Sequence, residues 1–216
     1  MDLRTDCLTT RRRFLRDSAA LGAAAALIGE PGAAAEPGLT IVGPKAGYSP
    51  QIGTLVSEMA FMRDQVLRST KDLSQKDLDF LLDDKANTIG ALLLHLAAVE
   101  AFFQANTFDG IPSGQMPEAF KAKWGLPMEL GEPARKSIKG NGIDHYYEIL
   151  SGTREHTLAE FRKRDDRWLA AVDQGWGWGP TNNYCKWFHV TEHEANHNGQ
   201  IKFLKSRLPG AKPASE

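Results

Sequence analysis

The chain has 216 residues, of which 25% are charged and 42% are hydrophobic. This composition is typical of soluble globular proteins and differs from that of disordered or fibrous chains. The formal net charge is −1, so no basic excess indicates binding to nucleic acid or to an anionic membrane surface. The 10 Phe and 5 Trp residues can supply one core, and the length fits a single domain.

The first 35 residues have the layout of an export signal. Residues 10–16 read Thr-Arg-Arg-Arg-Phe-Leu-Arg, which resembles the twin-arginine motif. An uncharged, alanine-rich stretch follows from Ser18 to Ile28, and at about 11 residues it is too short for a membrane span of roughly 20. Ala33 to Ala35 form a small-residue cleavage site, which makes Glu36 the expected first mature residue. We therefore expect twin-arginine export to the periplasm or medium, with no stable membrane anchor. The alternative is a cytoplasmic protein with a basic, alanine-rich N-terminal helix.

Cysteine usage excludes an internal disulfide in the mature chain. The two cysteines are Cys7 and Cys185, and Cys7 lies in the segment that we expect to be removed. In an oxidising compartment the fold must then be stabilised by its core, by a metal or by a partner subunit. Cys185 could lie near a functional site or be a small buried hydrophobe.

Apolar residues recur at helical spacing through residues 36–216 and predict an all-α domain with four long helices. The first opens at Ser49-Pro50, because Ser is a good N-cap and Pro suits the first helical turn. The second is expected to start near Asn87-Thr88. The third is expected from about Asp144 to Val172, and the fourth from about Asn182 to Arg207. The one β-like run is Leu39–Val42.

A long connection separates the second predicted helix from the third. It runs from Asp109 to Gly142, is rich in Gly and Pro, and has no sustained period. A long crossover between helices is a known bundle topology. Loops of this length often form lids or walls of binding sites, and a structural strap across the helices is the alternative.

The histidines of the fourth predicted helix lie on one face. His189, His193 and His197 are each four residues apart, so neighbours differ by about 40° around the helix axis. Two imidazoles at this spacing can bind one metal ion. His95 is the best third ligand, because it lies among apolar residues on the inward face of the second helix and needs a polar partner. We therefore predict one metal on His95, His193 and His197, with an open position that suits catalysis.

Other candidate residues have weaker arguments. His189 could be an outer hydrogen-bond partner of the site, a replacement ligand or a packed core residue. His145 and His156 lie among charged residues and are interpreted as surface residues. Glu194 could be a general base beside the metal or an exposed helix residue. The stretch Trp176–Gly179 could line a pocket mouth or cap the end of the helices.

The residues from His193 to His197 also match H-E-x-x-H, the signature of zinc proteases. The extended form of that signature requires Gly and His where this chain has Gln200 and Phe203. The only Glu downstream is Glu216, the last residue, and the β-sheet expected before such a helix is missing. A protease is therefore the least favoured interpretation.

Two stretches resemble the DinB-like superfamily of four-helix metalloproteins. They read Asn87-Thr88-Ile89-Gly90, then Leu93-Leu94-His95-Leu96 with Glu100, and His189-Val190-x-Glu192-His193-Glu194-x-x-His197-x-Gly199-Gln200-Ile201. In layout the similarity covers roughly residues 48–208. The resemblance implies an up-down-down-up bundle with a metal on His95, His193 and His197. Characterised members include thiol-dependent S-transferases and a maleylpyruvate isomerase, in which the metal activates a low-molecular-weight thiol.

The site and the resemblance together predict an exported, metal-dependent enzyme of the transferase or hydrolase type. It would act on a small molecule, with the metal activating a water or a thiol. A non-catalytic metal-binding protein is the alternative. Imidazole suits zinc, nickel and iron, so one divalent ion of these is the expected cofactor. The expected partner is a small-molecule substrate and not nucleic acid, and both a monomer and a homodimer fit the sequence.

Overall fold

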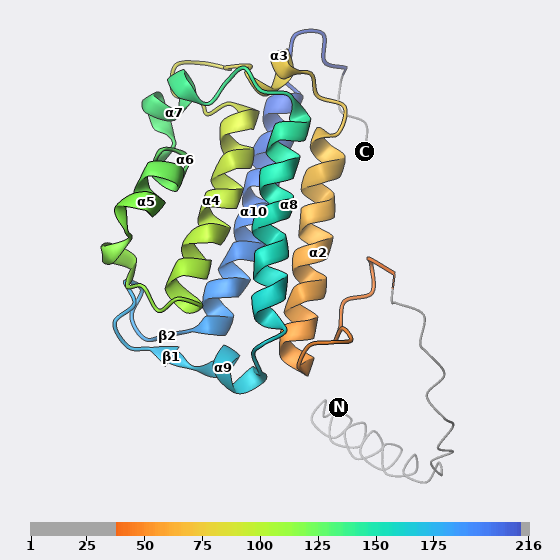
Figure 1. Cartoon of the computed structure of the whole chain (residues 1–216). Helices are drawn as coiled ribbons and strands as arrows, with labels where there is room; N and C mark the ends of the chain where they lie inside the picture. The colour runs from red at the N-terminus through yellow and green to blue at the C-terminus, as the bar shows by residue number, and fades with distance from the viewer. Residues whose placement is uncertain (1–37, 213–216) are drawn as a thin grey trace, which may run out of the picture. The chain divides into compact units, whose positions relative to one another are not determined.

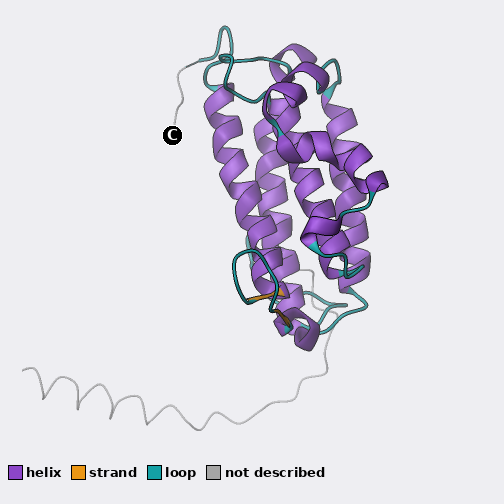
Figure 2. Ribbon diagram, turned by 90° about the vertical axis from the view of Figure 1, so that its left-hand side faces the viewer, coloured by secondary structure: helices purple, strands orange, loops and turns teal. Residues whose placement is uncertain are grey.

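The computed structural model of the protein describes residues 38–212. The expected signal peptide, residues 1–35, lies outside the described residues. Most of the described chain is helical, which confirms the all-α class. Four long helices lie side by side (Figures 1 and 2). They are α2 (Pro50–Thr70), α4 (Ile89–Thr107), α8 (Ile143–Phe161) and α10 (Asn183–Lys205).

Each long helix packs against at least one other. α10 contacts both α2 and α4, and α4 contacts α8. α4 is long and apolar enough to cross a membrane by length and composition, but 83% of the relevant window is buried inside the described fold. It is therefore placed as a core helix, with apolar neighbours on most of its sides.

The remaining elements are short. Between α2 and α4 lies α3 (Gln75–Leu78). The segment between α4 and α8 contains η2 (Ser113–Gln115), α5 (Glu118–Phe120), η3 (Lys121–Gly125), α6 (Leu126–Glu129) and α7 (Gly131–Ser137). Between α8 and α10 come α9 (Asp166–Ala170) and the antiparallel pair β1 (Val172–Asp173) and β2 (Thr181–Asn182). The connection between α4 and α8 is thus a run of helical turns, and α6 packs against α4 (Figure 1).

The prediction of a third helix reaching Val172 was wrong, because α8 ends at Phe161. A new helix, α9, starts five residues later, after the Asp165 carboxylate, which accepts the backbone N–H of Trp168 at 2.9 Å. This cap redirects the chain, and Val172 then enters β1. The prediction of a β-like run at Leu39–Val42 was also wrong, since Leu39 and Thr40 form a turn and Ile41 is 62% exposed.

The short helix α9 caps the start of α2. Ser49 was predicted to cap this helix, but its side chain makes no capping hydrogen bond to the helix. Instead the Asp166 carboxylate accepts the Ser49 hydroxyl at 2.6 Å and the backbone N–H groups of Gln51 and Ile52 at 3.1 and 3.3 Å. These hydrogen bonds lower the pKa of Asp166, so the cap is an ionised carboxylate at the positive end of the helix.

Two glycines on long helices have opposite surroundings. A Cβ on Gly90 would lie 2.5 Å from the hydroxyl oxygen of Tyr146, a fully buried residue. A Cβ on Gly199 would meet no atom within 4 Å. The close approach of α4 to α8 therefore requires glycine at position 90, whereas position 199 has room for a side chain.

We predict opposite effects of alanine at these positions. Gly90→Ala should lower the free energy of unfolding by about 1–3 kcal/mol, because the buried Tyr146 ring cannot move aside. Gly199→Ala should raise it by about 0.5–1 kcal/mol, because alanine loses less backbone entropy than glycine in a helix. Urea unfolding of both variants checks this, and equal effects of the two would contradict the packing described.

Candidate metal centre

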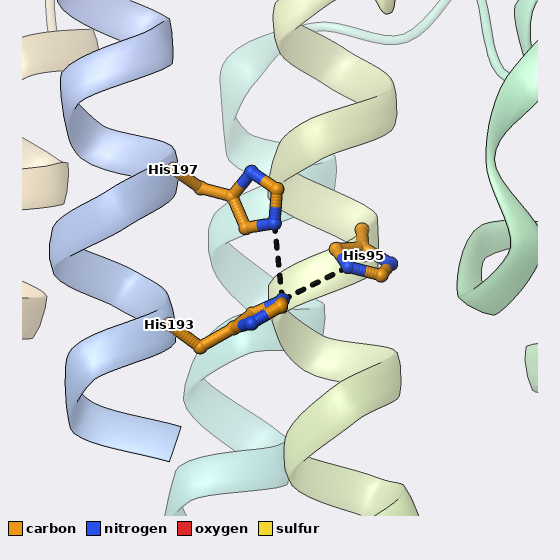
Figure 3. A group of neighbouring side chains, drawn as sticks. All are labelled: His95, His193 and His197. Carbon is orange, nitrogen blue, oxygen red and sulfur yellow. Dashed lines mark hydrogen bonds between the residues drawn. The ribbon is translucent and has the colours of Figure 1, made fainter. Parts of the chain in front are cut away.

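Three histidines converge between α4 and α10. His193 and His197 lie one turn apart on α10, and His95 faces them from α4 (Figure 3). The Nε2 atom of His193 is 2.9 Å from Nε2 of His95 and 3.0 Å from Nε2 of His197. Ligand atoms of the three residues all lie within 4.8 Å of one another. The structure thus brings together the three residues that the sequence predicts as ligands.

Burial keeps these imidazoles neutral. His95 and His197 are each 8% exposed, and His193 is half-buried. Burial lowers the pKa of His95 to about 4. Burial and the neighbouring histidines, His197 first, lower the pKa of His193 to about 3, and burial also lowers the pKa of His197. Neutral imidazole is the form that binds metal ions.

Outer hydrogen bonds fix which ring nitrogen carries the proton. The Nδ1–H of His95 donates to the carbonyl oxygen of Pro127 at 2.7 Å, and the Nδ1–H of His197 donates to Oε1 of Gln200 at 3.0 Å. Both acceptors are oxygens, so the Nε2 atoms of His95 and His197 present lone pairs. Such outer partners orient metal-binding imidazoles in many proteins.

The convergence of these nitrogens fits a cation. His193 Nε2 lies between the Nε2 lone pairs of His95 and His197. A single N–H at this atom can donate to only one of these two lone pairs. A metal ion among the three nitrogens would satisfy all three. Three neutral imidazoles are a ligand set for zinc, nickel or iron, and they leave a coordination position free for a further ligand.

The other histidines lie outside this cluster. The ring centroids of His189 and His193 are 5.2 Å apart. The Nδ1 atom of His189 is 3.1 Å from Oε2 of Glu192. It also makes edge contacts with the rings of Phe103 and Trp178, at centroid distances of 5.9 and 5.0 Å. His189 is therefore a wall residue next to the site.

Three further predicted positions are placed by the structure. His145 and His156 are exposed on α8, in agreement with their interpretation as surface residues. Cys185 is exposed as well, so its interpretation as a small buried hydrophobe is wrong.

Glu194 is buried, contrary to its interpretation as an exposed helix residue, and it belongs to an ion network with one residue from each long helix. Its Oε1 accepts hydrogen bonds from Arg63 of α2 at 2.6 Å and from Arg154 of α8 at 2.7 Å. Glu100 of α4 binds the same two arginines, at 2.9 and 2.7 Å. Only 1% of Glu194 and none of Glu100 is exposed. We call Arg63, Glu100, Arg154 and Glu194 the ion quartet.

The quartet is electrically balanced and nearly saturated with hydrogen bonds. Burial alone would raise the pKa of Glu100, but Arg154 and Arg63 outweigh it and hold the pKa below its usual value. The arginines also donate to the backbone carbonyls of Leu150 and Met59, at 2.9 and 3.0 Å. Within residues 38–212 the Oε2 atom of Glu194 has no partner. The sequence contained one signal for this network, since Arg63 lies on the inward-facing stripe of α2, between the buried residues Met59 and Val66.

Comparison with known proteins identifies one matching family and one solved structure with a similar fold. The sequence model of one family, described as Mycothiol-S-transferase, matches residues 54–210. No curated protein matches the chain. A solved structure of a conserved protein from Enterococcus faecalis has 11% sequence identity and a TM-score of 0.54, covering 70% of this chain and 93% of that chain. At this identity the likeness concerns the fold alone.

Metal content across single variants tests the ligand set. His95→Ala, His193→Ala and His197→Ala should each weaken metal binding by more than about 100-fold, beyond the effect expected for an outer residue. His145→Ala should bind like the wild type, and His189→Ala should keep full stoichiometry. Elemental analysis after reconstitution gives the stoichiometry. Retention of metal at wild-type affinity by His95→Ala would show that the ligands are other residues.

Removing one member of the ion quartet should destabilise the fold strongly. Arg154→Met leaves two buried carboxylates short of a partner, so the free energy of unfolding should fall by about 3–5 kcal/mol. The matched control is Arg68→Met, which breaks an exposed pair with Asp64 and should cost less than about 1 kcal/mol. Denaturant unfolding of both variants at neutral pH distinguishes these values. Equal losses would mean that the quartet contributes no more than a surface pair.

The quartet also predicts a direction of pH dependence. The pKa of Glu100 is lowered in the folded protein. The ionised Glu100 carboxylate therefore adds to the free energy of unfolding at pH values above the unfolded pKa of a glutamate, about 4.3. That contribution is lost as the pH falls through the lower folded value.

Proposed function

The chain belongs to the mycothiol-S-transferase family, within the DinB-like superfamily, and we propose that it is a metal-dependent transferase in which the metal activates a thiol for attack on a small molecule. The observation that carries this proposal is the convergence of three Nε2 atoms, two of them fixed as lone-pair donors. The family name supplies the reaction type, and the ligand set supplies a site suited to it.

When bound, the metal lowers the pKa of a thiol or water at its free position. The protein contributes orientation. Pro127 and Gln200 fix the ring planes and tautomers of His95 and His197, so these two ligands need little reorganisation. His189, Phe103 and Trp178 form an aromatic wall beside His193, against which an apolar substrate part can pack.

The proposal includes the finer topology of the fold. In Figure 1, α2 and α10 run in one direction and α4 and α8 in the other, which supports an up-down-down-up bundle. The segment between α4 and α8 would be its crossover connection. Because this segment contributes Pro127 to the anchoring of His95, we assign it the role of a wall of the site.

Export is part of the proposal as well. The twin-arginine motif at residues 10–16 and the alanines before Glu36 support cleavage of a signal peptide and a periplasmic or secreted location. N-terminal sequencing of protein recovered outside the cytoplasm tests this. An intact N-terminus found in the cytoplasm would refute it.

The zinc-protease alternative finds no support in the surroundings of Glu194. A general base must reach a water on the metal, and Oε1 of Glu194 is held by Arg63 and Arg154 instead. A hydrolase using another base, or a non-catalytic metal protein, would share the same ligands, and the assay below separates them from a transferase.

We predict metal-dependent S-transfer by the reconstituted protein. With mycothiol and monochlorobimane, an S–C bond should form and the C–Cl bond break, with chloride leaving and the thiol proton released to buffer. Chelation should lower the fluorescence rate by at least about 100-fold, and zinc, nickel or iron should restore it. His95→Ala should stay inactive, whereas His145→Ala should match the wild type. Equal rates with and without metal would contradict the proposal, and ester hydrolysis without S-transfer would favour the hydrolase.

A further inference from the structure

The hairpin of β1, β2 and the turn between them, residues 172–182, leads into the start of α10 and carries two tryptophans (Figure 1). Trp176 is buried, with 8% of its surface exposed, whereas Trp178 is 57% exposed. The two rings contact each other edge to face, with centroids 5.5 Å apart. Since only two residues of each strand pair, the position of the hairpin on the helices depends on side-chain contacts.

A buried lysine of α10 holds this hairpin in place. Only 2% of Lys186 is exposed, a placement that is costly unless the ammonium group is paired. Its Nζ donates to Oδ2 of Asp173 in the hairpin and to Oδ1 of Asn106 in α4, both at 2.8 Å, and lies 4.1 Å from the centroid of the Trp176 ring. The hydrogen bond from Lys186 lowers the pKa of Asp173, so the carboxylate is ionised at neutral pH. One ammonium group thus joins the hairpin to two long helices.

The anchored hairpin places Trp178 next to the histidine site. The ring of Trp176 packs against Phe103 of α4, with centroids 5.8 Å apart. The ring of Trp178 contacts the ring of His189 edge to face, with centroids 5.0 Å apart. His189 in turn contacts His193, at a centroid distance of 5.2 Å. Trp178 is therefore two ring contacts away from a proposed metal ligand.

The chemistry of this wall favours one kind of ligand. More than half of Trp178 is exposed, so an indole surface is open to solvent beside the site. A planar, conjugated group can stack on such a ring and lose apolar area without stripping water from a charge. A low-molecular-weight thiol rich in hydroxyl and amide groups would gain less there, because those groups must give up their hydration.

We propose that Trp178 binds the electrophile of the transferase reaction by stacking on a planar, conjugated group, and that Lys186 is the positioning residue that holds Trp178 at the site. This inference rests on the proposed function for the identity of the reaction. It adds the class of the electrophile and two residues outside the metal ligands that determine specificity. Because Lys186 acts through Trp178, its loss should not weaken binding more than the loss of Trp178 itself.

Binding can be measured without the reaction. The probe is the analogue of monochlorobimane in which a methyl group replaces the chloromethyl group, so that no thiol can be alkylated. Calorimetric titration of the full chain, reconstituted with zinc, should give a Kd on the order of 1 mM for a ligand of this size. Trp178→Ala should weaken binding roughly 3- to 10-fold. Phe203→Ala removes a ring of similar exposure near the other end of α10 and should bind like the wild type.

A double-mutant cycle tests the role of Lys186. Lys186→Met should weaken binding roughly 2- to 5-fold, and the double variant with Trp178→Ala should bind like Trp178→Ala alone, because the lysine acts through the tryptophan. General structural damage would instead add to the loss in the double variant. Asp173→Ala removes the hairpin partner of Lys186 and takes the place of Lys186→Met in the cycle if that variant does not fold. Metal stoichiometry should be unchanged throughout.

The S-transfer assay gives a second readout. Trp178→Ala and Lys186→Met should raise KM for monochlorobimane, while kcat and KM for mycothiol stay within about twofold of the wild type. Absence of saturable bimane binding would overturn the proposal, as would equal affinities of the wild type and Trp178→Ala, an additive double variant, or an effect on KM for mycothiol alone. Binding that follows these expectations in a protein without S-transfer would refute the proposed function and leave the aromatic subsite intact.

Discussion

The fold depends on four buried charges, one on each long helix. Arg63, Glu100, Arg154 and Glu194 bind one another inside the fold, and removal of any one leaves an uncompensated buried charge. Such networks contribute less to the free energy of unfolding than to the selection of one packing arrangement of the helices. Four apolar residues of similar volume could pack together with the helices rotated about their axes in several ways. Here the two guanidinium forks and two carboxylates match in only one rotation of each helix. The quartet thereby fixes which face of every helix points inward.

The same rotation presents the three histidines proposed as metal ligands. On α10, Glu194 follows His193 directly, so their side chains leave the helix about 100° apart. When Glu194 faces Arg63 and Arg154, His193 and His197 are turned toward α4. On α4, His95 and Glu100 are five residues apart and leave the helix about 140° apart, with Glu100 facing the arginines and His95 facing α10. A structural interaction and a chemical site therefore share two helices without sharing a face, and an error in the first would misplace the second.

The sequence was sufficient for some of these features and not for others. The four-residue spacing of His193 and His197 and the apolar neighbours of His95 predicted the convergence, since helical periodicity fixes faces locally. The contacts of Pro127 and Gln200 could not be predicted, because a backbone carbonyl leaves no mark in the sequence and the Gly199-Gln200-Ile201 stretch does not reveal which side chain Gln200 contacts. Arg154 reads as a surface residue when it lies between Thr153 and Glu155, and only its partners on other helices explain its burial. The end of α8 was missed because Asp165 and Asp166 act as caps for two different helices, which is a tertiary property.

The five residues His193 to His197 show how a short motif acquires its chemistry from its neighbours. In a zinc protease the glutamate of H-E-x-x-H must face the metal-bound water, so the space beside it has to be open. In this protein that direction is filled by two arginines from α2 and α8, which hold Oε1 of Glu194 at 2.6 and 2.7 Å. The histidine pair keeps its geometry, since an i, i+4 spacing on any helix aligns two imidazoles. The glutamate changes from a candidate base into a group that positions α10, so any proton transfer at a metal bound by the histidines would have to use other groups or solvent.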